Sequence, residues 1–161
     1  MSDLRTALCP GTFDPVHLGH MDIFERAAGM FDRVIVLVAA VSGKTPLLPL
    51  SKRADLVRAT AAHLDNVEVD TFEGLLVDYA RDANAAAIVK GLRSIDDFQH
   101  EQQMAMMNRA IFPDTDTVLL VTSPNVQYIS SSLIREIWTL GGDVSTFLPE
   151  TVAEALERMR H

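Results

Sequence analysis

Residues 6–30 read TALCPGTFDPVHLGHMDIFERAAGM, and this stretch sets the expected fold because it runs from a strand through a turn into a helix. Thr6–Cys9 is a short apolar run, Gly11–Pro15 is rich in turn-forming residues, and a helical pattern begins at about Gly19 and continues to Met30. A buried strand followed by a helix is the first half of a βαβ unit, in which a right-handed crossover leads to a parallel strand. The opening stretch therefore predicts a parallel sheet.

The rest of the chain repeats this alternation. Further strands are predicted where short runs are rich in apolar residues: at 34–40, 67–69, 86–89 and 118–121. Helical patterns cover residues 51–63, 74–83, 96–111, 130–140 and about 149–159. The predicted fold is a single α/β domain over residues 1–161, with a Rossmann-like, doubly wound, five-stranded, mostly parallel sheet and C-terminal helices. Such sheets bind ligands beyond the carboxyl ends of their strands, so functional residues are expected there.

Composition excludes several classes of protein. The chain of 161 residues has 14 Lys and Arg against 22 Asp and Glu, and a net charge of −8 makes nucleic acid an unfavourable partner. The single Cys9 cannot form an intramolecular disulfide, and the start MSDLRTALCP lacks the organisation of a secretory signal, so a cytoplasmic location is expected. The longest apolar run, Val34–Val41, has 8 residues, whereas a membrane-spanning helix needs about 20, so no membrane insertion is expected.

The first candidate site is His17-Leu18-Gly19-His20, which follows the first predicted strand. Two imidazoles at a helix N-terminus favour an anion, because free N–H groups and the helix dipole attract negative charge there. Capping or packing of the helix is the structural alternative for both histidines. Zinc would require a third ligand at a suitable offset, which is lacking, so no metal site is predicted. Neither G-x-x-x-x-G-K-[ST] nor G-x-G-x-x-G follows the strand, which argues against a P-loop kinase and an ordinary dinucleotide fold.

Three further segments follow predicted strands or begin a helix. Lys90-Gly91-Leu92-Arg93 places two cations after the fourth strand, where an arginine fork suits phosphate, although a solvated turn is the alternative. Ser130-Ser131-Ser132 begins a helix, where one serine would suffice as the N-cap and three suggest a second anion site. Lys44, in the loop after the second strand, is an exposed lysine by default and a candidate phosphate ligand by position. Two anion sites together predict a polyphosphate ligand.

These segments resemble the HxGH nucleotidyltransferase superfamily and, within it, the bacterial phosphopantetheine adenylyltransferases. The resemblance rests on residues 10–15, Gly19-His20, 90–93, 129–133, 142–144 and 147–150, and it covers nearly the whole chain. It implies transfer of AMP from ATP to 4′-phosphopantetheine, with Mg²⁺ as cofactor, in a homohexamer. The products are dephospho-coenzyme A and pyrophosphate, and coenzyme A is a further candidate ligand.

The resemblance also implies roles for individual residues. His20 matches the catalytic histidine, and Thr12, Lys44, Leu76 and Lys90 match positions that bind the acceptor. Positions that bind ATP are matched by Thr12, Phe13, His17, His20, Gly91, Leu92, Arg93, Glu101, Val126, Gln127, Tyr128, Ile129, Ser130, Ser131 and Ser132. Many members have threonine where this chain has His17, so we expect His17 to support catalysis by orienting phosphate.

Two other functions compete with this hypothesis. A nicotinamide mononucleotide adenylyltransferase or a cytidylyltransferase would share the reaction type, but the three serines and the Lys90–Arg93 segment favour the phosphopantetheine enzyme. A non-catalytic nucleotide-binding module would share the fold and use His20 for binding alone. Release of pyrophosphate during turnover distinguishes an enzyme from such a module.

Overall fold

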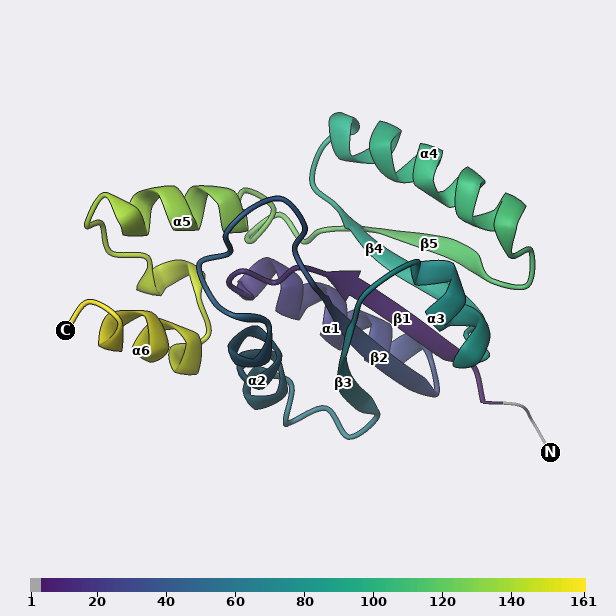
Figure 1. Cartoon of the computed structure of the whole chain (residues 1–161), viewed down its shortest axis with the longest axis horizontal. Coiled ribbons are helices and arrows are strands. Elements are labelled where there is room, and N and C mark those ends of the chain that lie inside the picture. Colours follow the sequence, from purple (N-terminus) through teal and green to yellow (C-terminus); the bar gives the residue numbers. More distant parts are fainter. Residues whose placement is uncertain (1–3) are drawn as a thin grey trace.

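The computed structural model describes residues 4–161 and contains a five-stranded parallel sheet with the strand order β3-β2-β1-β4-β5 (Figure 1). All four strand pairings are parallel. The strands are β1 (Thr6–Gly11), β2 (Arg33–Ala39), β3 (Val67–Phe72), β4 (Ala87–Leu92) and β5 (Asp116–Val121). The predicted Rossmann-like sheet is confirmed, and the first three residues of the predicted domain lie outside the described range.

Six α-helices in the described residues accompany the sheet, and all of them were expected. They are α1 (Leu18–Met30), α2 (Leu50–Thr60), α3 (Leu76–Asp82), α4 (Ile95–Ile111), α5 (Ser131–Thr139) and α6 (Glu150–Arg158). A short 3-10 helix, Ser145–Phe147, is an addition that the sequence pattern did not predict. No helix within residues 4–161 has the length and hydropathy that a bilayer crossing requires.

The predicted strands differ from the observed ones mainly at their carboxyl ends. β1 continues to Gly11 and β4 to Leu92, beyond the predicted ends at Cys9 and Val89. Lys90 and Gly91 are therefore the last part of a strand and not a loop after it. Polar and glycine residues are typical of the end of a strand, but the backbone pairing of β4 with β5 continues through them.

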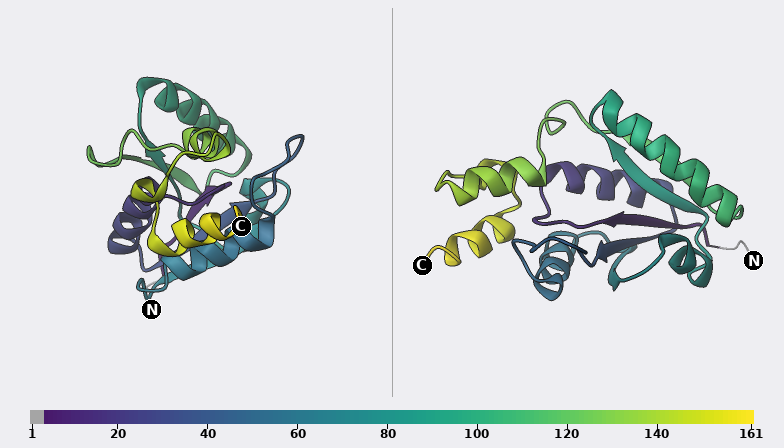
Figure 2. Two further views of the ribbon diagram at one scale, coloured as in Figure 1. Left: turned by 90° about the vertical axis from the view of Figure 1, so that its left-hand side faces the viewer. Right: turned by 45° about the horizontal axis from the view of Figure 1, so that its top comes forward.

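The two faces of the sheet carry separate apolar clusters. Alternate strand residues such as Ala7, Val34 and Val36 pack with α1, α2, α5 and α6, whereas Leu8 and Leu37 pack on the other face with α3. The helices α5 and α6 lie together beyond the end of the sheet opposite the N-terminus (Figures 1 and 2). This arrangement places the start of α5 near the carboxyl ends of the strands.

The strand order creates a topological switch between β1 and β4. The chain leaves β1 toward β2 on one side and later returns to place β4 on the other side. The segments that follow the two strands therefore diverge and leave a crevice, which is where doubly wound sheets bind ligands.

Leu37 tests this packing, because its side chain on β2 is fully buried. We expect Leu37→Ala to lower the free energy of unfolding by about 2–5 kcal/mol, since it removes buried methyl groups and leaves a cavity. Leu4→Ala is the matched control, because Leu4 is 67% exposed and its truncation should change stability by less than about 0.5 kcal/mol. Urea unfolding of both variants measures the difference, and equal stabilities would contradict the described core.

Candidate active site

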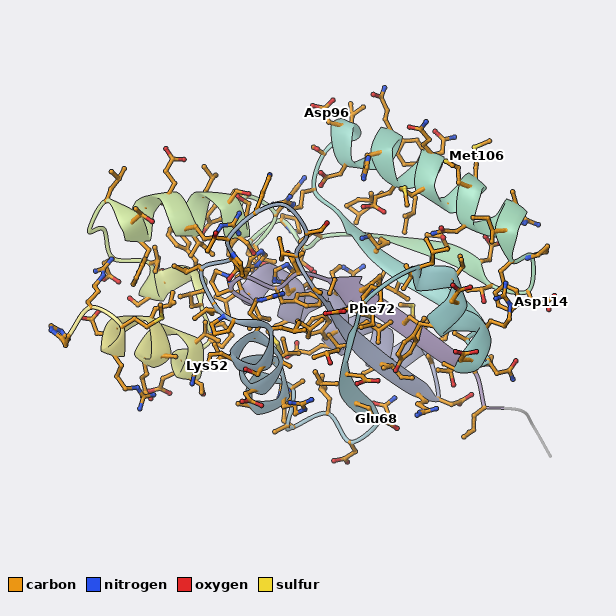
Figure 3. The ribbon with its side chains drawn as sticks, viewed as in Figure 1. Lys52, Glu68, Phe72, Asp96, Met106 and Asp114 are labelled. Carbon is orange, nitrogen blue, oxygen red and sulfur yellow. The ribbon has the colours of Figure 1, made fainter. Side chains whose placement is uncertain are left out.

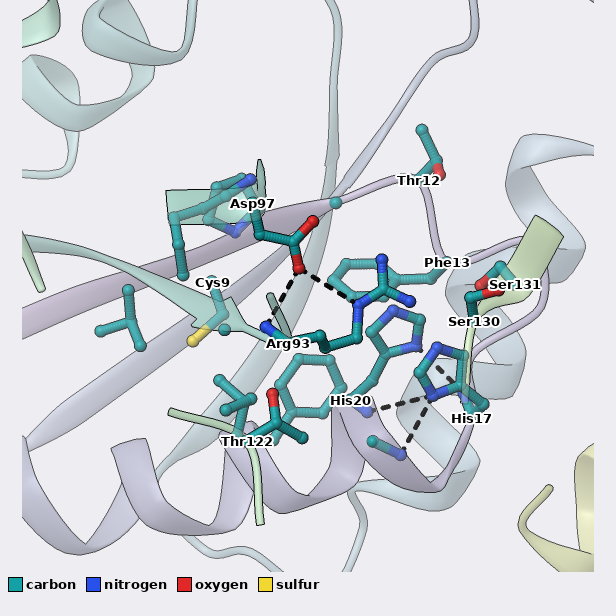
Figure 4. A pocket seen from close by; sticks show the side chains of 18 of the residues that line it. Cys9, Thr12, Phe13, His17, His20, Arg93, Asp97, Thr122, Ser130 and Ser131 are labelled. Carbon is teal, nitrogen blue, oxygen red and sulfur yellow. Dashed lines mark hydrogen bonds and ion pairs between the residues drawn. The ribbon is translucent and has the colours of Figure 1, made fainter. Parts of the chain in front are cut away.

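A cavity of about 340 Å³ lies at the switch between β1 and β4 (Figure 4). Its volume falls within the usual range of small-molecule sites. The ends of β1 and β4 form its floor, and the starts of α1, α4 and α5 contribute to its walls. The lining residues are Cys9, Pro10, Gly11, Thr12, Phe13, His17, Gly19, His20, Ile23, Phe24, Val89, Lys90, Gly91, Arg93, Asp97, Glu101, Thr122, Ser130, Ser131, Ser132 and Arg135.

The turn between β1 and α1 places an aromatic ring against His20. Phe13 has a φ of 48°, in the left-handed region that non-glycine residues rarely adopt. Its buried ring meets the His20 imidazole edge to face, with 4.9 Å between the ring centres. Thr12, one residue earlier, remains exposed at the rim of the cavity. The turn thus supports His20 from one side and presents a hydroxyl to the site.

His17 and His20 cap the first turn of α1 reciprocally. Nδ1 of His17 accepts hydrogen bonds from the backbone N–H groups of Gly19 at 3.0 Å and His20 at 3.3 Å. Nδ1 of His20 accepts from the backbone N–H of His17 at 3.1 Å. A backbone N–H can only donate, so both Nδ1 atoms must be unprotonated acceptors. Each imidazole therefore carries its proton on Nε2, which is the atom left to donate to a ligand.

The capping arrangement explains both Gly19 and the unusual His17. The two imidazoles stack with 3.6 Å between their centres, and a Cβ on Gly19 would lie 2.9 Å from the His17 ring. A side chain at position 19 would push the His17 ring out of its capping position. Threonine is also a favoured N-cap residue, so His17 fills a structural role that threonine can fill. Helix capping, which the sequence also allows as the alternative to anion binding for these histidines, is therefore present in the fold.

The surroundings of both imidazoles disfavour their charged forms. Burial lowers the pKa of His17 to about 3, and the nearby Arg93 acts in the same direction. Burial also holds the pKa of His20 well below its usual value, with further lowering by His17, Arg93 and Lys90. At neutral pH both histidines are therefore neutral hydrogen-bond donors through Nε2.

Arg93 joins β4 to the segment before α5. Its Nη1 donates to the backbone oxygen of Ile129 at 3.0 Å, and Gln127 Nε2 donates to the backbone oxygen of Arg93 at 2.7 Å. Asp97 accepts from the Arg93 backbone N–H at 3.0 Å and lies 3.4 Å from Nε (Figure 4). The Arg93 side chain therefore lines the cavity with Nη1 bonded to Ile129 and Nε beside Asp97.

The start of α5 forms the opposite wall. Ser130 is the N-cap, because its side chain accepts from the Leu133 N–H at 3.2 Å. Ser131 donates to the backbone oxygen of Pro15 at 2.9 Å, which fastens α5 to the turn that precedes α1. Arg135 donates to the backbone oxygen of Asp14 at 2.7 Å and also lines the cavity. The two anion sites expected from the sequence therefore share one cavity.

The cavity is lined by more positively charged than negatively charged side chains. The lining contains Lys90, Arg93 and Arg135 but two carboxylates, and each carboxylate is paired with a cation. Lys90 Nζ lies 3.5 Å from Glu101, and Arg93 lies beside Asp97. An excess of positive charge with neutral imidazole donors suits an anionic ligand.

Most of the predicted site residues line this cavity, although some lie beside it. The predicted residues that line the cavity are Thr12, Phe13, His17, His20, Lys90, Gly91, Arg93, Glu101 and Ser130–Ser132. The remaining predicted ATP contacts, Leu92 and Val126–Ile129, are not among the lining residues, and Val126 and Ile129 are buried in the core. Leu76 lines a separate cavity of about 110 Å³ together with Lys90 and Glu101, and Lys44 is exposed on its loop.

Sequence reasoning did not single out Asp97, Thr122 or Arg135. Asp97 lies in the first turn of α4, four residues after Arg93, and this short separation is a signal for an ion pair that could have identified it. Arg135 follows the three serines by one helical turn, which also places it on the same side of α5. Thr122 follows β5 directly, at the strand end where ligand contacts are expected.

The buried neutral imidazoles predict a loss of stability in mild acid. In the unfolded chain each imidazole ionises near pH 6.5, above the folded pKa of about 3 for His17. The unfolded state therefore binds more protons as the pH falls below 6.5, and the free energy of unfolding decreases. Between pH 7.5 and 5.5 we expect His17 alone to account for about 1 kcal/mol of this loss.

Urea unfolding at both pH values tests this, with His17→Thr compared with the wild type. The threonine variant should retain its cap and lose about 1 kcal/mol less on acidification. His100→Ala, which removes an exposed histidine, should behave like the wild type. The same pH dependence in His17→Thr and wild type would contradict a buried neutral imidazole at position 17.

Comparison with known proteins agrees with this geometry. Residues 8–137 match the cytidylyltransferase-like family. The chain is 46% identical to a phosphopantetheine adenylyltransferase of Shouchella clausii, over 97% of this chain and 98% of the relative. It is 48% identical to a phosphopantetheine adenylyltransferase of Caldanaerobacter subterraneus, over 95% of this chain and 96% of the relative.

Among solved structures, the chain is similar to a protein from Vibrio parahaemolyticus assigned as a nicotinate-nucleotide adenylyltransferase. The TM-score is 0.72, with 22% identity over 97% of this chain and 93% of the other, and this likeness concerns the fold. The sequence relatives are far closer and cover nearly the full length. The chain therefore belongs to the cytidylyltransferase-like family and, within it, to the phosphopantetheine adenylyltransferases.

Proposed function

We propose that this protein transfers the AMP moiety of ATP to 4′-phosphopantetheine, giving dephospho-coenzyme A and pyrophosphate. Membership of the phosphopantetheine adenylyltransferases supports the reaction. In this chain the supporting observation is the cavity at the switch point between β1 and β4. The residues that line it include His20, Lys90, Arg93 and the serines at the start of α5. Coenzyme A contains the product within its structure and is a further candidate ligand of the same site.

The reaction needs no covalent intermediate with the protein. An oxygen of the acceptor phosphate attacks the α-phosphorus of ATP, the new P–O bond forms, and the bond to the β-phosphate breaks to release pyrophosphate. The phosphate acceptor is already anionic at neutral pH, so no strong general base is required. Cys9 lines the cavity, but burial raises the pKa of its thiol to about 12 and leaves it a poor nucleophile.

His20 stabilises the charge that develops during transfer. Its Nδ1 is held by the backbone of His17, so the Nε2–H donates to an oxygen of the α-phosphate. A neutral donor fixed in advance does not have to reorganise as charge accumulates. Arg93 and the start of α5 supply positive charge and hydrogen bonds for the rest of the triphosphate.

Lys90 marks the boundary between ATP and the acceptor. It lines both the main cavity and the smaller cavity that contains Leu76, His100 and Met104. The phosphate of 4′-phosphopantetheine would lie at Lys90, and its largely uncharged arm would extend toward Leu76. Lys44, exposed on the loop after β2, supplies a second cation toward the same phosphate.

Mg²⁺ enters this proposal as part of the substrate, bound to the phosphates of ATP. No group of three or more potential ligands among His, Cys, Asp and Glu occurs within the described residues. The acidic residues of the cavity, Asp97 and Glu101, already pair with Arg93 and Lys90. Magnesium commonly retains water and binds substrate phosphates with few protein ligands, which is compatible with this lining.

The proposed enzyme is a homohexamer in the cytoplasm. The exposed surface of α4 supports self-association. None of the residues of α4 is buried in the single chain, and Ile95, Phe98, Met106 and Met107 are exposed. Met106 points away from the sheet in Figure 3. An exposed apolar helix face of this kind is typical of a subunit contact.

Pyrophosphate release tests the proposed reaction directly. The wild-type protein with MgATP should release pyrophosphate with 4′-phosphopantetheine and produce dephospho-coenzyme A, identified by mass. Pantetheine without its phosphate is the matched control, because it lacks the attacking group and should give no product. Turnover with nicotinamide mononucleotide, or with CTP and a phosphorylated alcohol, in place of 4′-phosphopantetheine would contradict the assignment.

Substitution of His20 tests the proposed catalytic donor. His20→Ala should lower kcat by about 10²–10³, the usual effect of removing one preorganised donor. Calorimetric ATP affinity should change far less than kcat, because the interaction strengthens in the transition state. His63→Ala, which removes an exposed histidine beside Glu25, is the control and should retain wild-type kcat. An unchanged kcat with collapsed ATP binding would identify His20 as a ground-state ligand.

A further inference from the structure

Arg53 is a buried cation whose hydrogen bonds all end on backbone oxygens. It lies on α2 and is 1% exposed. Nε donates to the oxygen of Leu48 at 3.0 Å, and Nη1 donates to the oxygens of Thr12 at 2.7 Å and Ala39 at 2.8 Å. Burial of a guanidinium costs stability unless its donors are satisfied, and replacement by an apolar residue is often tolerated or stabilising. The contacts point to a role beyond packing.

The three oxygens belong to two segments, the end of β2 with the loop that follows it and the turn after β1. Ala39 ends β2 and Leu48 lies near the far end of the Lys44 loop, which we define as residues 40–49 between β2 and α2. One guanidinium therefore closes this loop near both ends. Its third bond, to Thr12, ties the closed loop to the turn that follows β1.

Asp14 fastens the same loop from the side of the turn. Its carboxylate oxygens accept from the backbone N–H groups of Leu47 at 2.8 Å and Leu48 at 2.9 Å. Asp14 is itself 4% exposed, so these bonds form out of solvent. Arg53 and Asp14 together make up what we call the loop clamp, with one charged group on each side of the Lys44 loop.

The loop clamp also stabilises an unfavourable backbone conformation. Phe13 lies between Thr12 and Asp14 and has a left-handed φ of 48°. Such a conformation is unfavourable for a residue with a Cβ, because the Cβ approaches the following carbonyl oxygen. Arg53 holds the oxygen of Thr12 on one side of Phe13, and Arg135 holds the oxygen of Asp14 on the other. Arg53 therefore contacts both the Lys44 loop and the turn whose Phe13 ring packs against His20.

We propose that the loop clamp positions Lys44 for the reaction, by holding the Lys44 loop on the Thr12–Asp14 turn so that the exposed lysine meets the acceptor phosphate beside Lys90. This inference rests on the proposed function. Neither Arg53 nor Asp14 lies among the reacting groups, so both act through the loop. Without the clamp, Lys44 would be carried on a free ten-residue loop and would lose the fixed position on which its contribution to the rate depends.

A double-mutant cycle between Arg53 and Lys44 tests this inference. Arg53→Lys keeps the positive charge but loses the planar fork that reaches three carbonyls. We expect it to lower kcat/KM for 4′-phosphopantetheine about tenfold or more, while calorimetric ATP affinity without acceptor stays within about threefold of wild type. Lys44→Ala should lower the same kcat/KM in the wild-type background. In the Arg53→Lys background this fold effect should be at least about threefold smaller, because the lysine is already misplaced.

Arg58→Lys provides the matched control on the same helix. Arg58 is exposed on α2 and pairs with Asp55 at 3.0 Å, so its substitution should leave both kinetic constants and the effect of Lys44→Ala unchanged. Independent effects of Arg53→Lys and Lys44→Ala would overturn the inference, as would a Lys44→Ala variant that retains wild-type activity. Absence of pyrophosphate release by the wild type would instead contradict the proposed function.

Asp14→Asn gives a second test if Arg53→Lys does not fold. It retains the size of the side chain but replaces one acceptor of the loop amides with a donor. Circular dichroism and thermal unfolding identify the variants that remain folded at the assay temperature. In Asp14→Asn the Lys44→Ala effect should again shrink at least about threefold. An undiminished effect in this background would overturn the inference.

Discussion

The reciprocal capping of α1 by His17 and His20 is the interaction on which the site depends. Both Nδ1 atoms accept backbone N–H groups, so neither ring can rotate or change its tautomer without breaking the first turn of the helix. The imidazoles are thereby fixed as Nε2 donors, and their burial near Arg93 keeps them uncharged. The same hydrogen bonds stabilise the helix and fix Nε2 of both rings as the free donor.

The sheet supplies the second constraint, because its strand order brings distant segments to one crevice. The β1–β4 switch leaves a crevice above the strand ends. Arg93 connects β4 to the segment before α5, and Ser131 connects α5 to the turn before α1. Unpaired cations at such a site would repel one another. Their pairing with Asp97 and Glu101 reduces this repulsion and still leaves an excess of positive charge for a polyanionic ligand.

The sequence predicted the order of strands and helices, because consecutive apolar residues and helical periodicity are local signals. It also predicted that the residues around His20, Lys90 and Ser130 would meet, since parallel strands end at one edge. The carboxyl ends of β1 and β4 were missed, because pairing with neighbouring strands extends them through glycine and polar residues. Arg53 could not be distinguished from an ordinary helical arginine, because its three acceptors are brought together only by the fold.

In the proposed reaction His20 presents a neutral Nε2–H to the phosphate and is held by the backbone at Nδ1. Nitrogen NMR of ¹⁵N-histidine-labelled protein measures this most directly, with His20→Ala and His17→Thr used to assign the two rings. Both rings should show an unprotonated Nδ1 and a protonated Nε2, without a change between pH 8 and pH 6. A proton on Nδ1 of His20, or titration of that ring near its ordinary pKa, would contradict it.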